Sequence, residues 1–314
     1  MKRQLDYRNL SGDDRGTAVA IGNFDGVHLG HQSVLALARA AAVSHDAPFG
    51  VVTFEPHPRS FFQKDAPPFR LMTADVRARR LEKLGVEQLY EIPFNADLAS
   101  LTADEFVEDI LVAALGIVHL VAGADFRFGK GRTGDVDFLK TAGAKLGFDV
   151  TVAPLVSDGE GDYSSTAIRN ALADGDPATA RRILGHWHRM EGQVQHGDKR
   201  GRNLGYPTIN LDPDGLHIPK YGVYSVLVDV LTGPHAGTYA GAASFGERPT
   251  FGKNAPNIEV YLLDFSGDLY GELVSVALVD YQRSEWKFDD VEALKSQMAL
   301  DVQKARATTT PFLP

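Results

Sequence analysis

Two histidines lie three positions apart in a glycine-rich segment that follows a short apolar run. The segment reads GNFDGVHLGH over residues 22–31, with His28 and His31 at the start of a helical pattern. Glycines at such a turn let the backbone approach a phosphate, and a helix N-terminus adds N–H groups and positive potential. Side chains three apart on a helix share a face, so both imidazoles can reach one anion. The pattern favours nucleotidyl transfer, which needs donors for the charge that builds on the attacked phosphate.

Two plainer interpretations of this segment stay open. A glycine-containing turn between a strand and a helix can be purely structural. Paired histidines also bind metals, although no third ligand follows them at an obvious spacing.

A second candidate phosphate contact is the segment SSTAIR at residues 164–169. Serine and threonine hydroxyls satisfy the first free N–H groups of any helix, so an ordinary helix cap is the alternative. Arg169 makes the segment more informative, because its guanidinium can reach back to a phosphate held by those hydroxyls. The segment follows the last apolar run of the first half, and we expect it to face His28 and His31.

Any kinase activity needs a scaffold other than the P-loop. The glycine-rich segment 123–131 lacks both the P-loop spacing and its final hydroxyl. The second half offers GDKRGRNLGYPTIN over residues 197–210, where glycines and cationic side chains could fold over a polyphosphate. The Thr208 hydroxyl and the Asn210 amide oxygen are hard ligands that suit Mg2+. A polar hairpin loop is the alternative.

Glu259 is a candidate base in the second half. Its neighbours Ile258 and Val260 share one face of an expected strand, so Glu259 points to the other face. A carboxylate there could accept a hydroxyl proton. A solvated strand residue is the alternative interpretation.

The first half must position the histidines, and its pattern is that of an α/β domain with a doubly wound parallel sheet. Short apolar runs alternate with amphipathic helical stretches, which implies parallel strands joined by helices. Ligands of such sheets bind at the carboxyl ends of the strands. The expected strands lie in AVAIGNF, FGVVTF, QLYEIPF, VHLVAGADF and FDVTVAPLV, and the expected helices near 31–43, 74–84, 102–114 and 135–146.

The second half has a different pattern, with short alternating segments separated by Gly, Pro and Asp turns. It predicts an antiparallel barrel or sandwich, closed by a helix over about residues 290–307 with Leu294, Met298, Val302 and Ala305 on one face. The expected strands are 190–196, 222–231, 238–245, 258–264 and 273–279. We place the domains at 1–185 and 186–314, in keeping with two domains for 314 residues.

Composition narrows the classes of partner. The net charge is −9 and both halves are acidic, so we expect no nucleic-acid partner. The absence of cysteine excludes disulfides, thiolate nucleophiles and cysteine-bound metal sites. We find neither a secretory leader nor an apolar run of membrane-spanning length, so we expect a cytoplasmic protein without a membrane partner. The sequence leaves the oligomeric state open.

Motifs in both halves resemble the bacterial bifunctional riboflavin kinase/FAD synthetase (FMN adenylyltransferase) family. In the first half they are GNFDGVHLGHQ, TFEPHP at 53–58, GADFRFGKGRTGD at 123–135 and SSTAIR. In the second half they are GDKRGRNLGYPTIN, PKYGVYSV at 219–226, FGERPTFG at 245–252, IEVYLLDFSGDLYG at 258–271 and DVQKAR at 301–306. The resemblance covers residues 17 to about 185 and about 187 to 307, nearly the whole chain.

For the first half, the resemblance implies an adenylyltransferase site for ATP and FMN. Some members have Asp where Glu55 stands and Asn where Asp125 stands. A flavin presents a flat face for stacking and imide edges for hydrogen bonds; core packing is the alternative for Phe61 and Phe62. The implied ATP contacts are Gly22, Phe24, Asp25, His28, His31, Ser164, Ser165, Thr166 and Arg169, and the implied flavin contacts are His57, Phe61 or Phe62, Asp125, Phe126 and Phe128.

For the second half, the resemblance implies a six-stranded antiparallel riboflavin kinase barrel with a C-terminal helix. Glu259 would deprotonate the ribityl 5′-hydroxyl, and Arg306 would help close the flavin site. Thr208 and Asn210 would hold Mg2+. The implied ATP and Mg2+ contacts together are Gly197, Lys199, Gly201, Arg202, Gly205, Thr208 and Asn210.

The resemblance therefore implies two consecutive reactions. Riboflavin and ATP give FMN, and FMN and ATP then give FAD and pyrophosphate. Two alternatives remain: an adenylyltransferase of single activity whose barrel only binds a ligand, and a flavin-binding sensor without catalysis. The residues Thr208, Asn210 and Glu259 argue against the first alternative, and His28 and His31 argue against the second.

Overall fold

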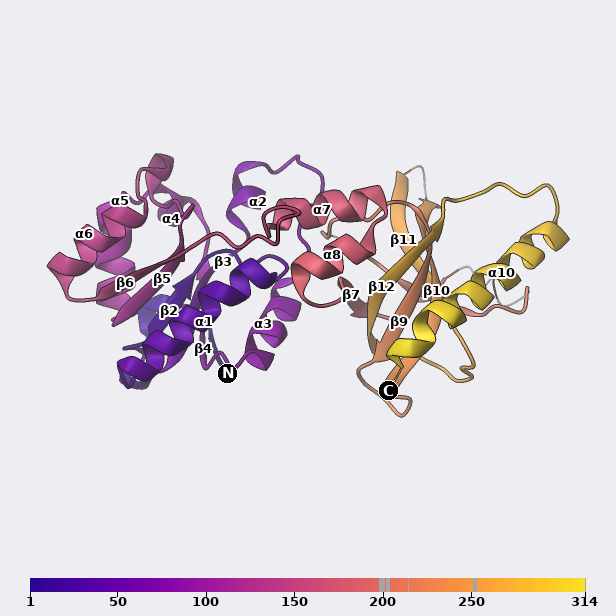
Figure 1. Ribbon diagram of the computed structural model, residues 1–314, viewed down its shortest axis with the longest axis horizontal. Helices are drawn as coiled ribbons and strands as arrows, with labels where there is room; N and C mark the ends of the chain where they lie inside the picture. The colour runs from indigo at the N-terminus through magenta and orange to yellow at the C-terminus, as the bar shows by residue number, and fades with distance from the viewer. Residues whose placement is uncertain (198–200, 202–203, 214, 251–252, 314) are drawn as a thin grey trace. The chain divides into compact units, whose positions relative to one another are not determined.

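The chain forms two compact units, each with its own six-stranded sheet (Figure 1). The computed structural model describes all residues except 198–200, 202–203, 214, 251–252 and 314. The first unit comprises Met1–Ala66 and Ala74–Ser164, and the second comprises Pro67–Thr73 and Ser165–Pro314. Residues 165–185 thus pack with the second unit, and the limits 1–185 and 186–314 stay a prediction about sequence modules.

The sheet of the first unit is parallel throughout, which confirms the predicted doubly wound architecture. Its strand order is β1-β4-β3-β2-β5-β6. The order reverses direction at β2, and the carboxyl ends of strands at such a switch point form a crevice for ligands. The strands are β1 (Lys2–Gln4), β2 (Ala18–Ile21), β3 (Phe49–Glu55), β4 (Gln88–Pro93), β5 (His119–Gly123) and β6 (Asp149–Ala153).

Helices cover both faces of this sheet, with α1 and α3 on the same face (Figure 1). The expected helix at 102–114 differs from a plain α-helix. It starts with a capping box between Thr102 and Glu105 and then continues as a π-helix, η3. The helical elements of this unit are η1 (Tyr7–Asn9), η2 (Gly12–Asp14), α1 (Leu29–Ser44), α2 (Pro58–Phe62), α3 (Ala74–Lys83), α4 (Ala96–Ser100), α5 (Ala103–Glu105), η3 (Phe106–Ala114), η4 (Lys130–Arg132) and α6 (Val136–Leu146).

The structure sharpens the strand predictions for this unit at two points. The first expected strand lies within the run AVAIGNF and ends at Ile21, before Phe24, whose left-handed φ of 52° no strand accommodates. The short β1 was not expected at all, since three polar residues carry no apolar pattern.

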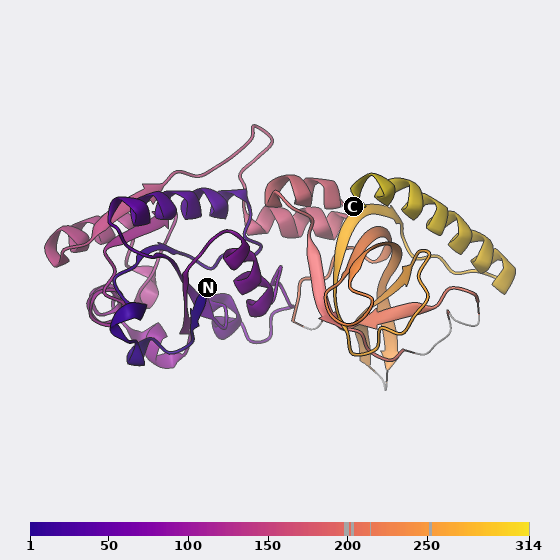
Figure 2. The ribbon, with the colours of Figure 1, turned by 90° about the horizontal axis from the view of Figure 1, so that it is seen from below.

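The sheet of the second unit is antiparallel and curled, which confirms the predicted barrel-type architecture (Figure 2). Its order is β7-β12-β9-β10-β11-β8, and the outer strands meet where Gln195 N–H donates to the Asn210 carbonyl at 2.9 Å. β8 lies within the segment that we expected as a loop. The strands are β7 (Arg189–Gln193), β8 (Thr208–Leu211), β9 (Gly222–Val230), β10 (Gly237–Thr250), β11 (Lys253–Leu262) and β12 (Leu273–Arg283), preceded by α7 (Ser165–Asp174) and α8 (Pro177–Leu184).

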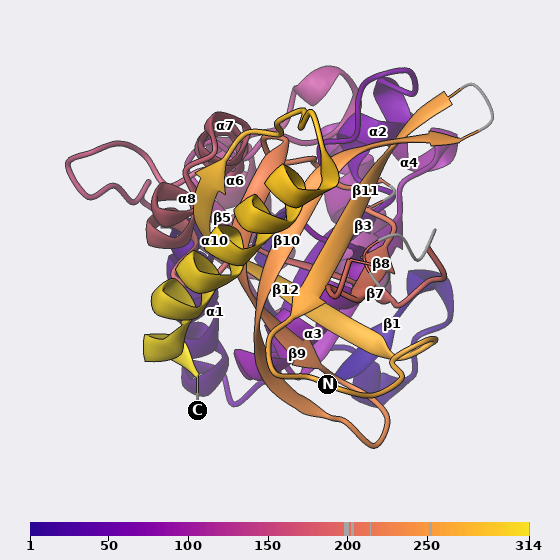
Figure 3. The same cartoon turned by 90° about the vertical axis from the view of Figure 1, so that its right-hand side faces the viewer.

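The C-terminal helix α10 (Val291–Thr309) packs across β9, β10 and β12, and the short η5 (Thr310–Phe312) follows it (Figure 3). The expected apolar face points inward, with Ala305 buried. An ion pair fixes the helix to the sheet, because Arg283 Nη2 donates to Asp301 Oδ2 at 2.6 Å. Asp290 begins the helix by accepting the N–H of Ala293.

Candidate active sites

The turn between β2 and α1 has a strained backbone. Phe24 and Val27 have φ of 52° and 45°, and Gly26 has φ of 87°. Left-handed backbone is costly for Phe and especially for a β-branched Val. Both side chains are buried, so packing holds the turn in this shape. The Gly22 N–H also donates to the Val52 carbonyl of β3 at 3.1 Å.

His28 and His31 lie together on the first turn of α1, as the sequence predicts. His28 is the N-cap, and its Nδ1 accepts the His31 backbone N–H at 3.3 Å. A neutral His28 ring therefore carries its proton on Nε2. The two rings stack with centroids 3.6 Å apart. Gly30 makes this possible, because a Cβ there would lie 3.1 Å from the His28 ring and from the Tyr163 carbonyl.

The surroundings of His31 favour its neutral form. Burial, and then the neighbouring His28, hold the pKa of His31 well below its usual value. His31 Nδ1 is buried and finds no hydrogen-bond partner among the described residues. A neutral imidazole can donate one N–H to a phosphate oxygen without adding charge. In the described part of the chain, no third ligand turns the pair into a metal cluster.

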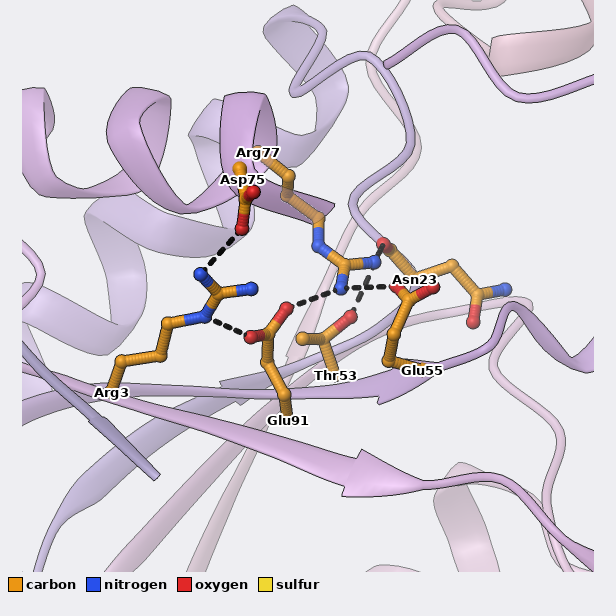
Figure 4. A network of polar contacts seen from close by, with 7 residues as sticks. All are labelled: Arg3, Asn23, Thr53, Glu55, Asp75, Arg77 and Glu91. Atoms are coloured by element: carbon orange, nitrogen blue, oxygen red, sulfur yellow. Dashed lines mark hydrogen bonds and ion pairs between the residues drawn. The ribbon is translucent and has the colours of Figure 1, made fainter. Parts of the chain in front are cut away.

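A buried network of charges lies under this turn (Figure 4). Arg77 of α3 is fully buried and donates to the Asn23 carbonyl at 3.2 Å, to Glu55 at 3.0 Å and to Glu91 at 2.7 Å. Arg3 of β1 donates to the other Glu91 oxygen. Arg77 thus ties the turn after β2 to the end of β3, where the TFEPHP motif begins.

Thr53 adds a second tie to the same turn. Its hydroxyl donates to the Asn23 carbonyl at 3.2 Å. The network was missed at the sequence level, although Glu91 gave a signal: a carboxylate inside the apolar run QLYEIPF needs a buried cation. Nothing in the sequence of α3 distinguishes Arg77 from Arg79 and Arg80.

A row of aromatic rings joins the segment after β3 to the segment after β5. Successive centroids lie between 5.2 and 6.3 Å apart. Phe94, Phe54, Phe106 and Phe128 belong to the core cluster, whereas Phe61 is half-buried. At the two ends of the row, Phe62 is 66% exposed and Phe126 is half-buried. In order, the row is Phe62, Phe61, Phe94, Phe54, Phe106, Phe128 and Phe126.

Two polar side chains accompany the ends of the row. His57 caps α2, with its Nδ1 accepting the Arg59 N–H at 3.1 Å. Asp125 is exposed in the segment after β5. Both segments leave the carboxyl ends of their strands, where a parallel sheet binds ligands.

The second unit brings three predicted residues into register. Asn210 of β8 pairs with Glu259 of β11, and Thr208 lies two positions away on the same strand. Paired residues, and residues two apart, project from the same face of a sheet. Asn257 Nδ2 donates to Glu259 Oε1 at 3.1 Å. The strand pairing therefore places two neutral oxygen donors next to a carboxylate.

Two of the predicted glycines lie against these donors. A Cβ on Gly197 would lie 2.3 Å from Asn210 Nδ2, and one on Gly201 would lie 2.4 Å from the Tyr206 carbonyl and 3.5 Å from Thr208 Oγ1. Only glycine permits such close approach. Gly205 has a left-handed φ of 89°.

Comparison with known proteins shows the family to which the chain belongs. A family model described as FAD synthetase matches residues 10–167, and one described as riboflavin kinase matches residues 184–309. The bifunctional riboflavin kinase/FMN adenylyltransferase of Pseudomonas fluorescens is 44% identical over 304 residues, 96% of each chain. Its counterpart from Escherichia coli K12 is 39% identical over 307 residues, 98% of this chain and 97% of that one. The chain belongs to this family.

A solved structure supports the fold of this riboflavin kinase/FMN adenylyltransferase family member. A crystal structure described as a macrolide-efflux protein from Streptococcus pneumoniae has a TM-score of 0.85 and 34% identity, covering 97% of this chain and 98% of that chain. The word efflux in that description refers to the Streptococcus pneumoniae protein. Across the described residues of the present chain, no helix has the length and apolar character needed to cross a bilayer.

Phe128 and Arg306 make contacts within the protein that the sequence did not indicate. Phe128 is 6% exposed and packs in the core between Phe106 and Phe138, so its ring supports Phe126 from behind. Arg306 makes a two-pronged ion pair with Asp264, at 2.6 and 2.8 Å. That pair lowers the pKa of Asp264, chiefly through the hydrogen bond from Arg306. Lys199 and Arg202 lie outside the described residues.

The expected phosphate contacts of SSTAIR divide between the units. Ser164 ends the first unit, next to Tyr163, whose carbonyl lies against Gly30. Ser165, Thr166 and Arg169 belong to the second unit. There Arg169 donates to the Phe69 carbonyl at 3.3 Å and lies over the Phe69 ring. Their role beside His28 and His31 stays a prediction.

Proposed function

We propose that His28 and His31 form the centre of the FMN adenylyltransferase site. An oxygen of the FMN phosphate attacks the α-phosphorus of ATP, the bond to the bridging oxygen breaks, and pyrophosphate leaves. The nucleophile is already ionised near neutral pH, so the protein needs no base. Its task is to donate hydrogen bonds to the charge on the α-phosphate oxygens. The observation that supports this most is the stacking of the His28 and His31 rings on the first turn of α1, where burial lowers the pKa of His31.

We assign the remaining flavin and ATP contacts of this site from the positions of the residues in the structure and in the sequence motifs. Flavin stacking belongs to the accessible ends of the aromatic row, with Asp125 and His57 as polar partners. The backbone of the strained turn approaches the ATP phosphates. The assigned ATP contacts are Gly22, Phe24, Asp25, His28, His31, Ser164, Ser165, Thr166 and Arg169, and the assigned flavin contacts are His57, Phe62, Asp125 and Phe126, supported by Phe128.

Glu259 is the base of the riboflavin kinase site in this proposal. It takes the proton of the ribityl 5′-hydroxyl as that oxygen attacks the γ-phosphorus of ATP and ADP leaves. The pairing of Glu259 with Asn210 in the β8–β11 register supports this role. Gly197, Gly201 and Gly205 let the preceding loop approach the nucleotide, and Lys199 and Arg202 supply positive charge to it. Arg306 helps close the flavin site.

Thr208 and Asn210 fit a magnesium ion bound together with ATP. Their side chains offer neutral oxygen donors from the same face of β8, and Mg2+ in phosphotransferases takes few protein ligands and completes its shell with phosphate and water. The ion supplies electrostatic stabilisation of the transferred phosphoryl group.

One product assay tests the two-site assignment. Purified chain is incubated with riboflavin and Mg-ATP, and FMN and FAD are separated by chromatography. We expect FMN first and FAD later. FAD made only from added FMN would indicate a single-activity adenylyltransferase, and flavin binding without either product would indicate a sensor.

A further inference from the structure

Two histidines and an aspartate gather at the edge of the first sheet opposite to the adenylyltransferase site. His119 is the first residue of β5, Asp149 is the first residue of β6, and His45 caps the C-terminus of α1. One ligand atom from each lies within 4.8 Å of the others. His28 and His31 lie at the carboxyl end of β2, whereas these three residues lie where β5 and β6 begin.

Regular backbone, rather than a surface loop, brings the cluster together. His119 and Asp149 are register partners in the parallel pair β5–β6, so their side chains project from the same face. α1 packs on β5 and β6. The His45 N–H still donates to the Ala41 carbonyl, so the end of the helix holds this residue in place.

Two distances from His45 in the cluster are close to those between ligands of a zinc ion. His45 Nε2 lies 3.1 Å from His119 Nδ1 and 3.2 Å from Asp149 Oδ2. Two ligand atoms bound to a tetrahedral Zn2+ at about 2.1 Å each lie about 3.4 Å apart. The side chains therefore need to move only slightly to bind an ion between them.

Thr151 supplies the outer contact that metal-binding histidines usually have. The other ring nitrogen of His119, Nε2, lies 2.9 Å from Thr151 Oγ1. When Nε2–H donates to this hydroxyl, the lone pair of Nδ1 points into the cluster, which orients the ligand and fixes its tautomer. The side chain of Asp149 is 69% exposed, so solvent can reach the cluster and provide a fourth ligand.

We propose that His45, His119 and Asp149 bind a borderline divalent cation, of which Zn2+ is the representative, and that Thr151 orients His119. Two imidazoles and one carboxylate suit Zn2+ and its transition-metal neighbours, whereas Mg2+ prefers oxygen ligands alone. The ion links the end of α1 to β5 and β6. Because the unfolded chain lacks this arrangement, binding stabilises the first unit, and the stabilisation grows with the logarithm of the free metal concentration once this exceeds the Kd.

Calorimetric titration with ZnCl2 tests the proposal on the full chain. The protein is first treated with a chelator and then kept in excess Mg2+, which occupies oxygen sites. We expect one Zn2+ per chain, loss of this binding in His45→Ala, His119→Ala and Asp149→Ala, and a roughly 10–100-fold weaker affinity in Thr151→Val. His235→Ala, in the second unit, is the matched control and keeps wild-type binding.

A second titration addresses the other histidine pair of the first unit. If the proposal holds, a His28→Ala/His31→Ala variant still binds Zn2+, and bound Co2+ gives the strong visible absorption of a tetrahedral site. Zn2+ also raises the melting temperature of the wild type but not of Asp149→Ala, whose exposed side chain can be removed without disturbing the fold. Wild-type binding in Asp149→Ala and His119→Ala, or its loss in the His28/His31 variant, would overturn the assignment.

Discussion

The two candidate active sites are built in opposite ways. In the first unit, a turn with left-handed Phe24 and Val27 is held by packing, by Thr53 and by a fully buried Arg77. In the second unit, Asn210 and Glu259 come together simply because β8 and β11 pair in register. In the proposed roles, the first site supplies hydrogen-bond donors in fixed places to a nucleophile that is already ionised, whereas the second site supplies a base. Donors that stabilise developing charge must be held in fixed positions, and the packed and hydrogen-bonded turn of the first unit provides such positions.

Replacing Glu259, the proposed base of the kinase, tests the second site most strongly. Glu259→Gln keeps the shape and hydrogen bonding of the side chain but removes its basicity. A positioned base contributes about 10²–10⁴-fold, so we expect FMN formation to fall by that range with little change in ATP binding. The measurement is riboflavin turnover, with FAD formation from added FMN as the internal control. Near wild-type turnover would mean that Glu259 is only a solvated strand residue.

His31→Ala tests the first site by removing a proposed hydrogen-bond donor. Loss of one donor to developing phosphate charge should lower FAD formation by about 100-fold or more. FMN formation, in the other unit, should persist. Loss of both activities in a folded variant would contradict the assignment of two separate sites.

Arg77 tests whether the buried network supports the strained turn. Arg77→Met leaves the buried carboxylate of Glu91 short of a partner, and such a loss costs about 3–5 kcal/mol. We expect a lower free energy of unfolding for the first unit in urea and slower FAD formation, with the kinase unaffected. The double variant Arg77→Met/Glu91→Leu removes both partners and should recover much of the stability. Equal losses in the single and double variants would speak against a charge effect.

Variants at the Phe126 end of the aromatic row should have a smaller effect on activity. Asp125→Ala with Phe126→Ala should raise the KM for FMN by more than that for ATP, because both side chains are assigned to the flavin. Phe128→Ala serves as the contrasting variant: its ring is in the core, so truncation should cost about 3–5 kcal/mol of stability. An unchanged dependence on FMN in the first variant would place the flavin elsewhere.

The free energy of unfolding of the second unit should fall in acid because of a buried histidine. Burial, and then the neighbouring His217 and His186, lower the pKa of His188 to about 3. The unfolded chain binds a proton there below about pH 6.5 and the folded chain does not, so stability present above pH 6.5 is lost as the pH falls. The slope is at most about 1.4 kcal/mol per pH unit. Urea unfolding between pH 7 and pH 5 should show this slope in the wild type and a flatter one in His188→Gln.

Local patterns in the sequence were sufficient to predict most of the elements and the position of His28 and His31 at the start of a helix. Alternation of apolar runs with helices predicts a parallel sheet because parallel strands need crossovers, and the GNFDGVHLGH turn places His28 and His31 on the first turn of a helix. Family motifs added the substrates. These inferences hold because secondary-structure period and short motifs depend on neighbouring residues.

Contacts between distant segments were decided only by the tertiary structure. Arg77 meets Glu91 and Asn23 across three elements, and no local pattern marks it. The burial of Phe128 and the register of Asn210 with Glu259 follow from packing and strand pairing. The cluster of His45, His119 and Asp149 forms because parallel strands begin side by side and a helix ends over them. Such contacts depend on the summed packing of the whole unit, which a one-dimensional pattern does not contain.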